Sequence, residues 1–299
     1  MSMRDFREAP RPNYDYDVTR LTQEYEKALR GIQAELNSLF LTDFERAQIV
    51  AVEENIRSIL RDLRRYGNDW AKVAVTKSAT NGVATTIYAL GLTNTFEDAL
   101  KIAKFNGVNK RLVEAIIADT QADLLAVTDN VSRKTRAAVR QVSADVLRGK
   151  STAGINGTQS LQQAVTKGLR EKLGNAADTA IVDAAGRRWK LKTYTEMLAR
   201  TKMMEAHKEA TVNEALSEDV QYAVISRHRA SDACAKWEGK VVALTWDAPG
   251  NYPILSELPR NEIFHPNCKH LVTPVRRPDR LPDDLQELNG IEADEIGFI

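Results

Sequence analysis

The first half of the chain carries apolar residues at steps of three and four, the spacing that puts side chains on one face of an α-helix. One such face runs from Val18 to Leu39. Thr42 and Glu45 then form a capping box, in which a hydroxyl and a carboxylate satisfy the first free amides of a helix. We therefore expect one helix over about 18–39 and a second that ends near Tyr66.

More helices are expected up to about residue 148. Residues 67–69, Gly-Asn-Asp, are expected to interrupt the second helix, and a third stretch continues to about Leu90. A short helix is expected within 95–106, opened by a threonine and closed by Asn-Gly. The longest element is expected over about 109–148 and would measure about 60 Å at 1.5 Å per residue.

The second half mixes helical and strand patterns. Residues 149–158, which contain three glycines among polar residues, are expected to be a linker. Period-two alternation is weak in the strand candidates, and in 220–226 extra apolar residues blur it. The expected elements after the linker are a helix over 159–172, two short strands within 179–191, a helix over about 193–216, and strands within 220–226, 240–245 and 271–275.

These patterns predict a fold that is mainly α, with an elongated helical N-terminal half and a smaller α+β C-terminal domain. The expected division is a helical domain with an extended N-terminal arm at 1–148, the linker at 149–158, the α+β domain at 159–277, and an acidic, loosely attached tail at 278–299.

Composition places the chain among ordinary soluble proteins. It has 299 residues, of which 43% are hydrophobic and 28% charged. No apolar run approaches the roughly 20 residues that span a bilayer, and the N-terminus lacks the apolar core of a secretory signal. Two cysteines do not make a disulfide framework. We therefore expect a chain that is made in the cytoplasm and binds no membrane.

Charge is distributed unevenly although the net charge is only +1. Residues 133–210 hold 16 Lys and Arg against 7 Asp and Glu, whereas 211–299 hold 9 against 15. The basic stretch is either a solvated helix face or a surface that lies near nucleic acid, where phosphate attraction is independent of base sequence. The candidates for nucleic-acid contact are Arg133, Lys134, Arg136 and Arg140.

The strongest chemical signal lies between His228 and His270. Both cysteines of the chain and three of its four histidines fall in this region. His265 and Cys268 form a His-x-x-Cys pair, which a tight turn can present to one tetrahedral zinc ion. Cys234 would be a third ligand, and His228 or His270 the fourth. A structural zinc site is therefore one hypothesis for this cluster.

Two other hypotheses explain the cluster without a metal ion. Cys234 and Cys268 can be neighbours in a small core, because free cysteine is often buried as a small hydrophobe. In that case His265 would donate to a backbone carbonyl and residues 266–267 would form a turn. Alternatively, the two cysteines can form a disulfide if the protein ends in an extracellular particle.

Catalytic hypotheses have less support. Cys268 could pair with His228 or His270 as nucleophile and base, but nothing marks an oxyanion hole. A metal nuclease could use His265, Asn267 and His270, which lie too close together in sequence for a strand-strand-helix metal site. The zinc-deaminase signature and a phosphate-binding glycine loop are both missing from the sequence.

Four segments in the second half together resemble a known family. They are Gly186-Arg-Arg-Trp-Lys-Leu-Lys-Thr-Tyr194, Met197-Leu-Ala-Arg-Thr201, Cys234-Ala-Lys-Trp-Glu-Gly-Lys240 and His265-Pro-Asn-Cys-Lys-His270. In this order and spacing they are similar to the minor capsid protein 2 group of tailed bacteriophages, which is related to the Mu F-like head morphogenesis proteins. The resemblance covers about 182–274. The family usually has Arg where this chain has Lys269, a conservative change.

The resemblance implies a structural minor head protein of the virion, assembled in the bacterial host cytoplasm and associated with the portal vertex. It implies a role in head morphogenesis and in DNA packaging or ejection. The expected partners are the portal protein, then the major capsid or scaffolding protein, then DNA bound without sequence preference. No catalytic residues come with the family, so we expect no enzyme. The alternative is a metal-dependent nuclease or hydrolase centred on the His/Cys cluster.

Overall fold

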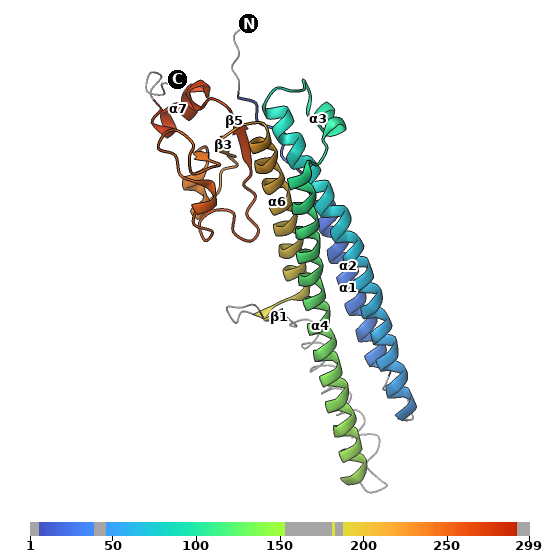
Figure 1. Ribbon diagram of the computed structural model, residues 1–299. Helices are drawn as coiled ribbons and strands as arrows, with labels where there is room; N and C mark the ends of the chain where they lie inside the picture. Colours follow the sequence, from blue (N-terminus) through green and yellow to red (C-terminus); the bar gives the residue numbers. More distant parts are fainter. Residues whose placement is uncertain (1–5, 39–45, 153–180, 183–187, 292–299) are drawn as a thin grey trace. The chain divides into compact units, whose positions relative to one another are not determined.

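The computed structural model describes residues 6–38, 46–152, 181–182 and 188–291. Most of these residues are helical, and a three-stranded antiparallel sheet lies in the C-terminal part (Figure 1). The predicted fold, mainly α with a smaller α+β C-terminal part, is therefore confirmed. Contacts group the chain into two units. Unit 1 contains Met1–Tyr14, Lys72–Ala118 and Leu198–Ile299, and unit 2 contains Asp15–Ala71 and Asp119–Met197.

The elements follow the predicted order. The helices are α1 (Asp15–Ser38), α2 (Arg46–Ala89), α3 (Phe96–Ile102), α4 (Gly107–Thr152), α6 (Leu191–Ser217) and α7 (Asp283–Asn289). The strands are β1 (Ile181–Val182), β2 (Arg188–Trp189), β3 (Tyr222–Ile225), β4 (Val241–Ala243) and β5 (Val272–Val275). Three short 3-10 helices, η1 (Ala233–Trp237), η2 (Leu255–Glu257) and η3 (Pro278–Arg280), lie between or after the last strands. In the part of the chain that the structure describes, no helix combines the length and apolar character that crossing a bilayer requires.

Helices α2 and α4 are longer than the sequence predicted. They have 44 and 46 residues, so they measure about 66 Å and 69 Å at 1.5 Å per residue. The predicted break at 67–69 is wrong, because α2 runs straight through it. A glycine inside a helix costs only about 1 kcal/mol relative to alanine. The burial of Leu63 and Trp70 on either side outweighs that cost.

The predicted domain limits stay a prediction, but two details differ. Helix α4 continues to Thr152, beyond the expected end of the helical domain at residue 148. The remainder of the expected linker and the helix expected over 159–172 lie outside the described residues.

Unit 2 is held by helix packing and by side chains that bond to a neighbouring helix backbone. The Tyr25 hydroxyl, on α1, donates to the carbonyl of Leu124 on α4 at 3.2 Å. The indole of Trp70, on α2, donates to the carbonyl of Asp17 on α1 at 2.8 Å. Strands β1 and β2 pair antiparallel, as the two short strands expected there.

In unit 1, helices α2 and α6 cross at close range. A Cβ atom added at Gly82 would lie 2.2 Å from the carbonyl oxygen of His207, so only glycine fits there. Threonines bridge the same crossing. Thr86 Oγ1 donates to the carbonyl of Thr211 at 2.9 Å, and Thr211 Oγ1 lies 3.1 Å from the carbonyl of Gly82.

A buried histidine lies beside this crossing and contacts the N-terminal arm, residues 6–14. His207, on α6, has Nδ1 2.8 Å from the hydroxyl of Tyr14 and Nε2 3.1 Å from the hydroxyl of Thr85. Burial lowers the pKa of His207 to about 3, so the ring is neutral. This histidine is a core residue, and both of its ring nitrogens have hydrogen-bond partners.

The three-stranded sheet has the order β4-β3-β5 and is buried on both faces. One face packs against the cluster region through Ala223, Ile225, Val242 and Val272. The other face packs against Phe6 and against residues of 281–291. It does so through Tyr222, Val224, Val241 and Val275. The alternation of apolar and polar residues in 220–226 is blurred because every residue of β3 is buried on one face of the sheet or the other.

The segment expected to be a loosely attached tail is instead part of the sheet core up to residue 291. Leu281 and Leu285 are buried against the second face of the sheet, where the arm residue Phe6 also packs. Asn289, at the end of α7, accepts from the amide of Val241 at 2.8 Å and donates to the carbonyl of Gly239 at 2.9 Å. The segment has few apolar residues, and of its three leucines Leu281 and Leu285 are buried whereas Leu288 is 40% exposed.

Candidate metal centre

The first cysteine is positioned by a short capped helix. Asp232 is the N-cap of η1, and its carboxylate accepts from the amide of Cys234 at 3.1 Å. This cap satisfies a free amide at the start of η1 and fixes the direction in which the helix leaves the loop. As a result, the Cys234 side chain is buried, with 1% exposure.

The second cysteine and one histidine share a tight turn. The amide of Cys268 donates to the carbonyl of His265 at 2.9 Å, which closes a four-residue turn. Pro266 is the second residue of this turn, and Asn267, the third, has φ +66°. Proline followed by a residue with positive φ is typical of a type II turn, and asparagine tolerates that conformation. The predicted presentation of a His-x-x-Cys pair by one turn is therefore what the structure has.

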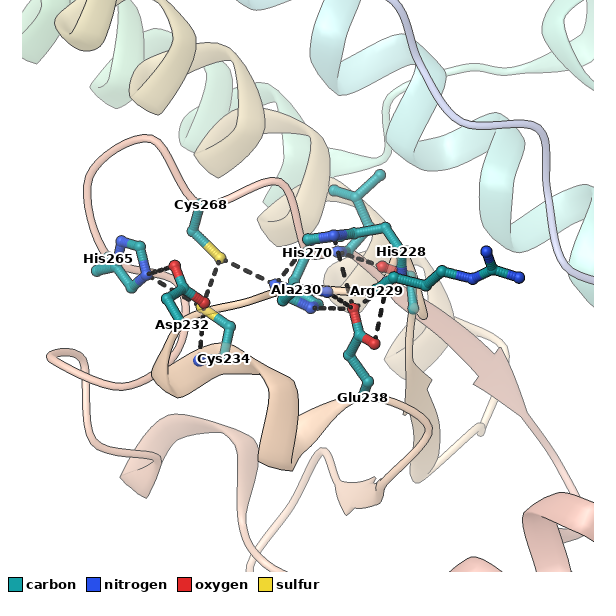
Figure 2. Close-up of polar contacts among 11 residues, drawn as sticks. His228, Arg229, Ala230, Asp232, Cys234, Glu238, His265, Cys268 and His270 are labelled. Carbon is teal, nitrogen blue, oxygen red and sulfur yellow. Dashed lines mark hydrogen bonds and ion pairs between the residues drawn. The ribbon is translucent and has the colours of Figure 1, made fainter.

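A carboxylate organises the opposite side of the cluster (Figure 2). Glu238 accepts from the amides of His228, Arg229 and Ala230 at 2.8, 3.1 and 3.0 Å. Its Oε1 also lies 3.2 Å from Nε2 of His270, whose side chain is buried. Burial raises the pKa of Glu238, but these hydrogen bonds outweigh it and bring the pKa to about 2. The carboxylate is therefore charged at any physiological pH.

The sulfur and nitrogen atoms of the cluster converge between these two sides. The two sulfurs of Cys234 and Cys268 are 3.8 Å apart, and Cys268 Sγ is 3.3 Å from Nδ1 of His270. Cys234 Sγ is 3.0 Å from Nε2 of His265. Both cysteines are free thiols. Burial first, and then the neighbouring Cys268, raise the pKa of the Cys234 thiol to about 12.

Three overlapping triplets could hold a metal ion, each with its ligand atoms within 4.8 Å of one another. They are Cys234, Cys268 and His270; Asp232, Cys234 and His265; and His228, Glu238 and His270. Thus the structure brings all five residues predicted as metal ligands into one connected cluster. Asp232 and Glu238 were missed, because a carboxylate beside a turn or a glycine carries no recognisable signal in one sequence.

The same contacts bear on the catalytic hypotheses. Cys268, His270 and Glu238 follow one another in the order of a nucleophile, a base and an orienting carboxylate. However, the cleft that reaches Cys268 and His270 has a volume of about 70 Å³. Pockets for small-molecule ligands measure roughly 300–1,000 Å³. Cys234 and His265 do not form a triad with Asp232, since sulfur and carboxylate approach the same nitrogen, Nε2.

The predicted nucleic-acid residues lie on helix α4, in unit 2. Arg133, Arg136 and Arg140 are exposed, and their spacing of three and four places them on one face of the helix. Lys134 is partly buried and is engaged with other residues of the protein. Three of the four candidates are therefore available at the surface.

Comparison with known proteins identifies the family. The family model described as phage minor capsid protein 2 matches residues 58–297. The chain therefore belongs to the phage minor capsid protein 2 family, as the resemblance implied. The match begins within α2 and extends well beyond 182–274, so it includes helices in which we recognised no motif. No curated protein and no solved structure matches the chain. The relation to Mu F-like proteins stays a prediction.

Proposed function

We propose that this minor capsid protein acts in head morphogenesis as a structural component of the virion that binds the portal protein at the portal vertex. Membership of a minor capsid family supports a role in the particle. The proposal goes further because the helical part of unit 1 exposes apolar side chains where a protein partner could cover them.

These side chains lie on one short stretch of chain. Leu92, Ile102 and Val108 are 52%, 52% and 50% exposed, and all three fall between the end of α2 and the first turn of α4. We take these three side chains as one contact surface, because contiguous exposed apolar patches mark protein contacts. Burying a fully exposed side chain of this kind contributes roughly 1.5–3 kcal/mol, so covering the exposed half of each contributes about half of that to a complex.

The test is co-expression of the chain with the portal protein of the same phage, followed by size exclusion and native mass spectrometry. We expect one stable complex of defined stoichiometry. Replacing Leu92, Ile102 and Val108 together by glutamate should abolish co-elution. The matched control is glutamate at Val73, which is 67% exposed on α2 and lies outside this stretch.

Two results would overturn the proposal. One is a pair of separate peaks from the unmodified proteins. The other is co-elution with the major capsid or scaffolding protein but never with the portal, which would place the protein elsewhere in the head.

A second role, contact with packaged DNA, is favoured by the three exposed arginines of α4. Arg133, Arg136 and Arg140 present positive charge on one helix face, which suits phosphate binding without base specificity. Such binding should weaken steeply between 50 and 200 mM salt. Glutamate at all three positions should remove it in gel shifts. Glutamate at Arg65, an exposed arginine of α2 that pairs with Asp62, is the control and should leave it nearly unchanged.

A further inference from the structure

We propose that Cys234, Cys268, His270 and His265 bind one zinc ion, and that Glu238 is a positioning residue that orients His270 toward it. The site is separate from the proposed portal contact and is made within the C-terminal part of unit 1. Its evidence is the buried triplet of Cys234, Cys268 and His270, whose ligand atoms lie within 4.8 Å of one another, and a second imidazole, His265, whose Nε2 lies 3.0 Å from Cys234 Sγ (Figure 2).

The spacing of the sulfurs fits a tetrahedral ion. Zinc–sulfur bonds of about 2.3 Å at the tetrahedral angle put two sulfurs about 3.8 Å apart. Cys234 Sγ and Cys268 Sγ are 3.8 Å apart. A disulfide needs about 2.05 Å, so it would require the two loops to move together. Zinc ligation needs a small opening of the sulfur–nitrogen contacts, which are 3.0 and 3.3 Å against about 3.6 Å around zinc. It also needs His265 to move toward Cys268 and His270, because its ligand atom is grouped only with those of Asp232 and Cys234.

The tautomer of His270 is set for ligation through Nδ1. Its Nε2 lies 3.2 Å from the carboxylate of Glu238, which three backbone amides hold in place. A carboxylate accepts only, so Nε2 carries the proton and Nδ1 keeps its lone pair. Nδ1 faces Cys268 Sγ. This is the carboxylate–histidine arrangement that orients metal ligands in zinc proteins.

The fourth ligand is assigned to His265 rather than His228. His228 stacks on the ring of His270, with centroids 4.0 Å apart and 37° between the planes. His228 Nε2 also lies 3.2 Å from Nδ1 of His270, so ligation by His228 is the alternative that the histidine variants below test. His265 contacts Cys234 Sγ directly and is carried by the same turn as Cys268.

Charge and location both favour the ion. Two thiolates neutralise Zn²⁺, and two neutral imidazoles complete the shell, so no net charge is buried. The four ligands come from η1, from the turn at 265–268 and from His270, two residues before β5. Zinc would therefore fasten three segments around a sheet whose strands have only three or four residues.

The first experiment measures zinc and cobalt in the intact full chain. Purified without chelator, the chain should contain one zinc per molecule by elemental mass spectrometry. After exchange, cobalt(II) should show thiolate charge-transfer absorption and the intense d–d bands of a tetrahedral site. A folded chain that holds no zinc when supplied with it, or a weak octahedral cobalt spectrum, would overturn the proposal.

Variants then test the assignment of ligands. Cys268→Ser and His265→Ala should lose the metal or its tetrahedral cobalt spectrum, while the matched histidine variant His228→Ala should keep both. Glu238→Gln should keep the cobalt spectrum but lower zinc affinity about 10–100-fold. Metal retained in His265→Ala and lost in His228→Ala would refute the assignment. If Cys268→Ser does not fold, the cobalt spectrum of the unmodified chain still decides.

The reactivity of the two thiols distinguishes a zinc site from the disulfide and nucleophile hypotheses. With zinc bound, both cysteines should resist alkylation until a chelator is added. A disulfide in the purified chain, or one cysteine alkylated rapidly with no effect of chelator, would contradict the proposal and favour the disulfide or the nucleophile. Portal binding is measured separately, so either proposal can fail without the other.

Discussion

The crossing of α2 and α6 and the Cys/His cluster lie in the same unit, yet they depend on opposite properties of their residues. The crossing depends on a missing side chain, because any Cβ at Gly82 would collide with the backbone of α6. The cluster depends on particular atoms, because sulfur and nitrogen must lie 3.0–3.3 Å apart and the two sulfurs 3.8 Å apart. In the first region size matters most, and in the second chemistry does. Substitutions should therefore break the two regions in different ways.

Cys268→Ser should have the largest effect, and a local one. Loss of a zinc ligand should reduce the stability of the C-terminal region by about 5 kcal/mol, roughly half of what structural zinc contributes in zinc-finger peptides. Limited proteolysis should cut within 226–291 while α1 and α2 stay intact. Ala235→Ser, at an exposed position of η1, is the control. A C-terminal fragment as resistant as that of the unmodified chain would contradict this.

Gly82→Ala should come next and should act on the helical part of unit 1. The added methyl meets a backbone oxygen, which cannot move aside as a flexible side chain can. Overpacking of this kind costs about 3 kcal/mol, to be measured by urea denaturation. Gly67→Ala is the control on the same helix, since its Cβ would meet Leu124 at an ordinary 3.4 Å. Equal stability of the two variants would show that the helices separate easily.

Acid should weaken the same region through His207. The pKa of this histidine is about 3 in the fold and about 6.5 when unfolded, so the unfolded chain binds the proton first. Its contribution is complete above pH 6.5 and declines as the pH falls toward 3. Between pH 7 and 5.5 the loss is about 1.3 kcal/mol. His207→Gln should flatten this part of the pH dependence, and an unchanged slope would locate the acid sensitivity elsewhere.

Asn289→Ala should have the smallest effect, confined to the contact of α7 with β4. It removes an acceptor for the amide of Val241 and a donor to the carbonyl of Gly239. We expect about 1 kcal/mol of local destabilisation, seen as faster hydrogen exchange at Val241. Leu288→Ala, at a 40% exposed neighbour, should leave that exchange rate close to normal.

Short sequence motifs predicted which helices and strands form better than they predicted where those elements begin and end. Thr95 was expected to open a short helix, and it caps α3 by accepting from the amide of Asp98. Gly67 was predicted to interrupt the second helix, but α2 continues through it, because tertiary packing outweighs the low helix propensity of glycine. Gly82 drew no attention, because nothing in one sequence shows which glycine another helix approaches.

The candidate site was predictable as a group of residues but not as a geometry. Cysteine and histidine are scarce in this chain, so their crowding between His228 and His270 was visible. Glu238 contacts Nε2 of His270 and thereby leaves Nδ1 to face Cys268 Sγ. That carboxylate gains its role only when a loop folds three amides around it. The sequence therefore left the zinc, disulfide and core hypotheses open. The 3.8 Å between the two sulfurs is too long for a disulfide and fits the proposed zinc ion, while the 2.9 Å from His265 Nδ1 to the carbonyl of Pro266 is the contact that the core hypothesis predicted.

The packing of the N-terminal arm has a consequence for the order of synthesis. Phe6 emerges from the ribosome early, but the core cluster against which it packs includes Val275, Leu281 and Leu285, which emerge near the end. At roughly 5–20 residues per second, a chain of 299 residues takes about 15–60 seconds to make. Until then the second face of the sheet cannot form. A chain that stops before β5 would therefore keep its first apolar residues uncovered, and quality-control proteases could remove it before it enters a growing particle.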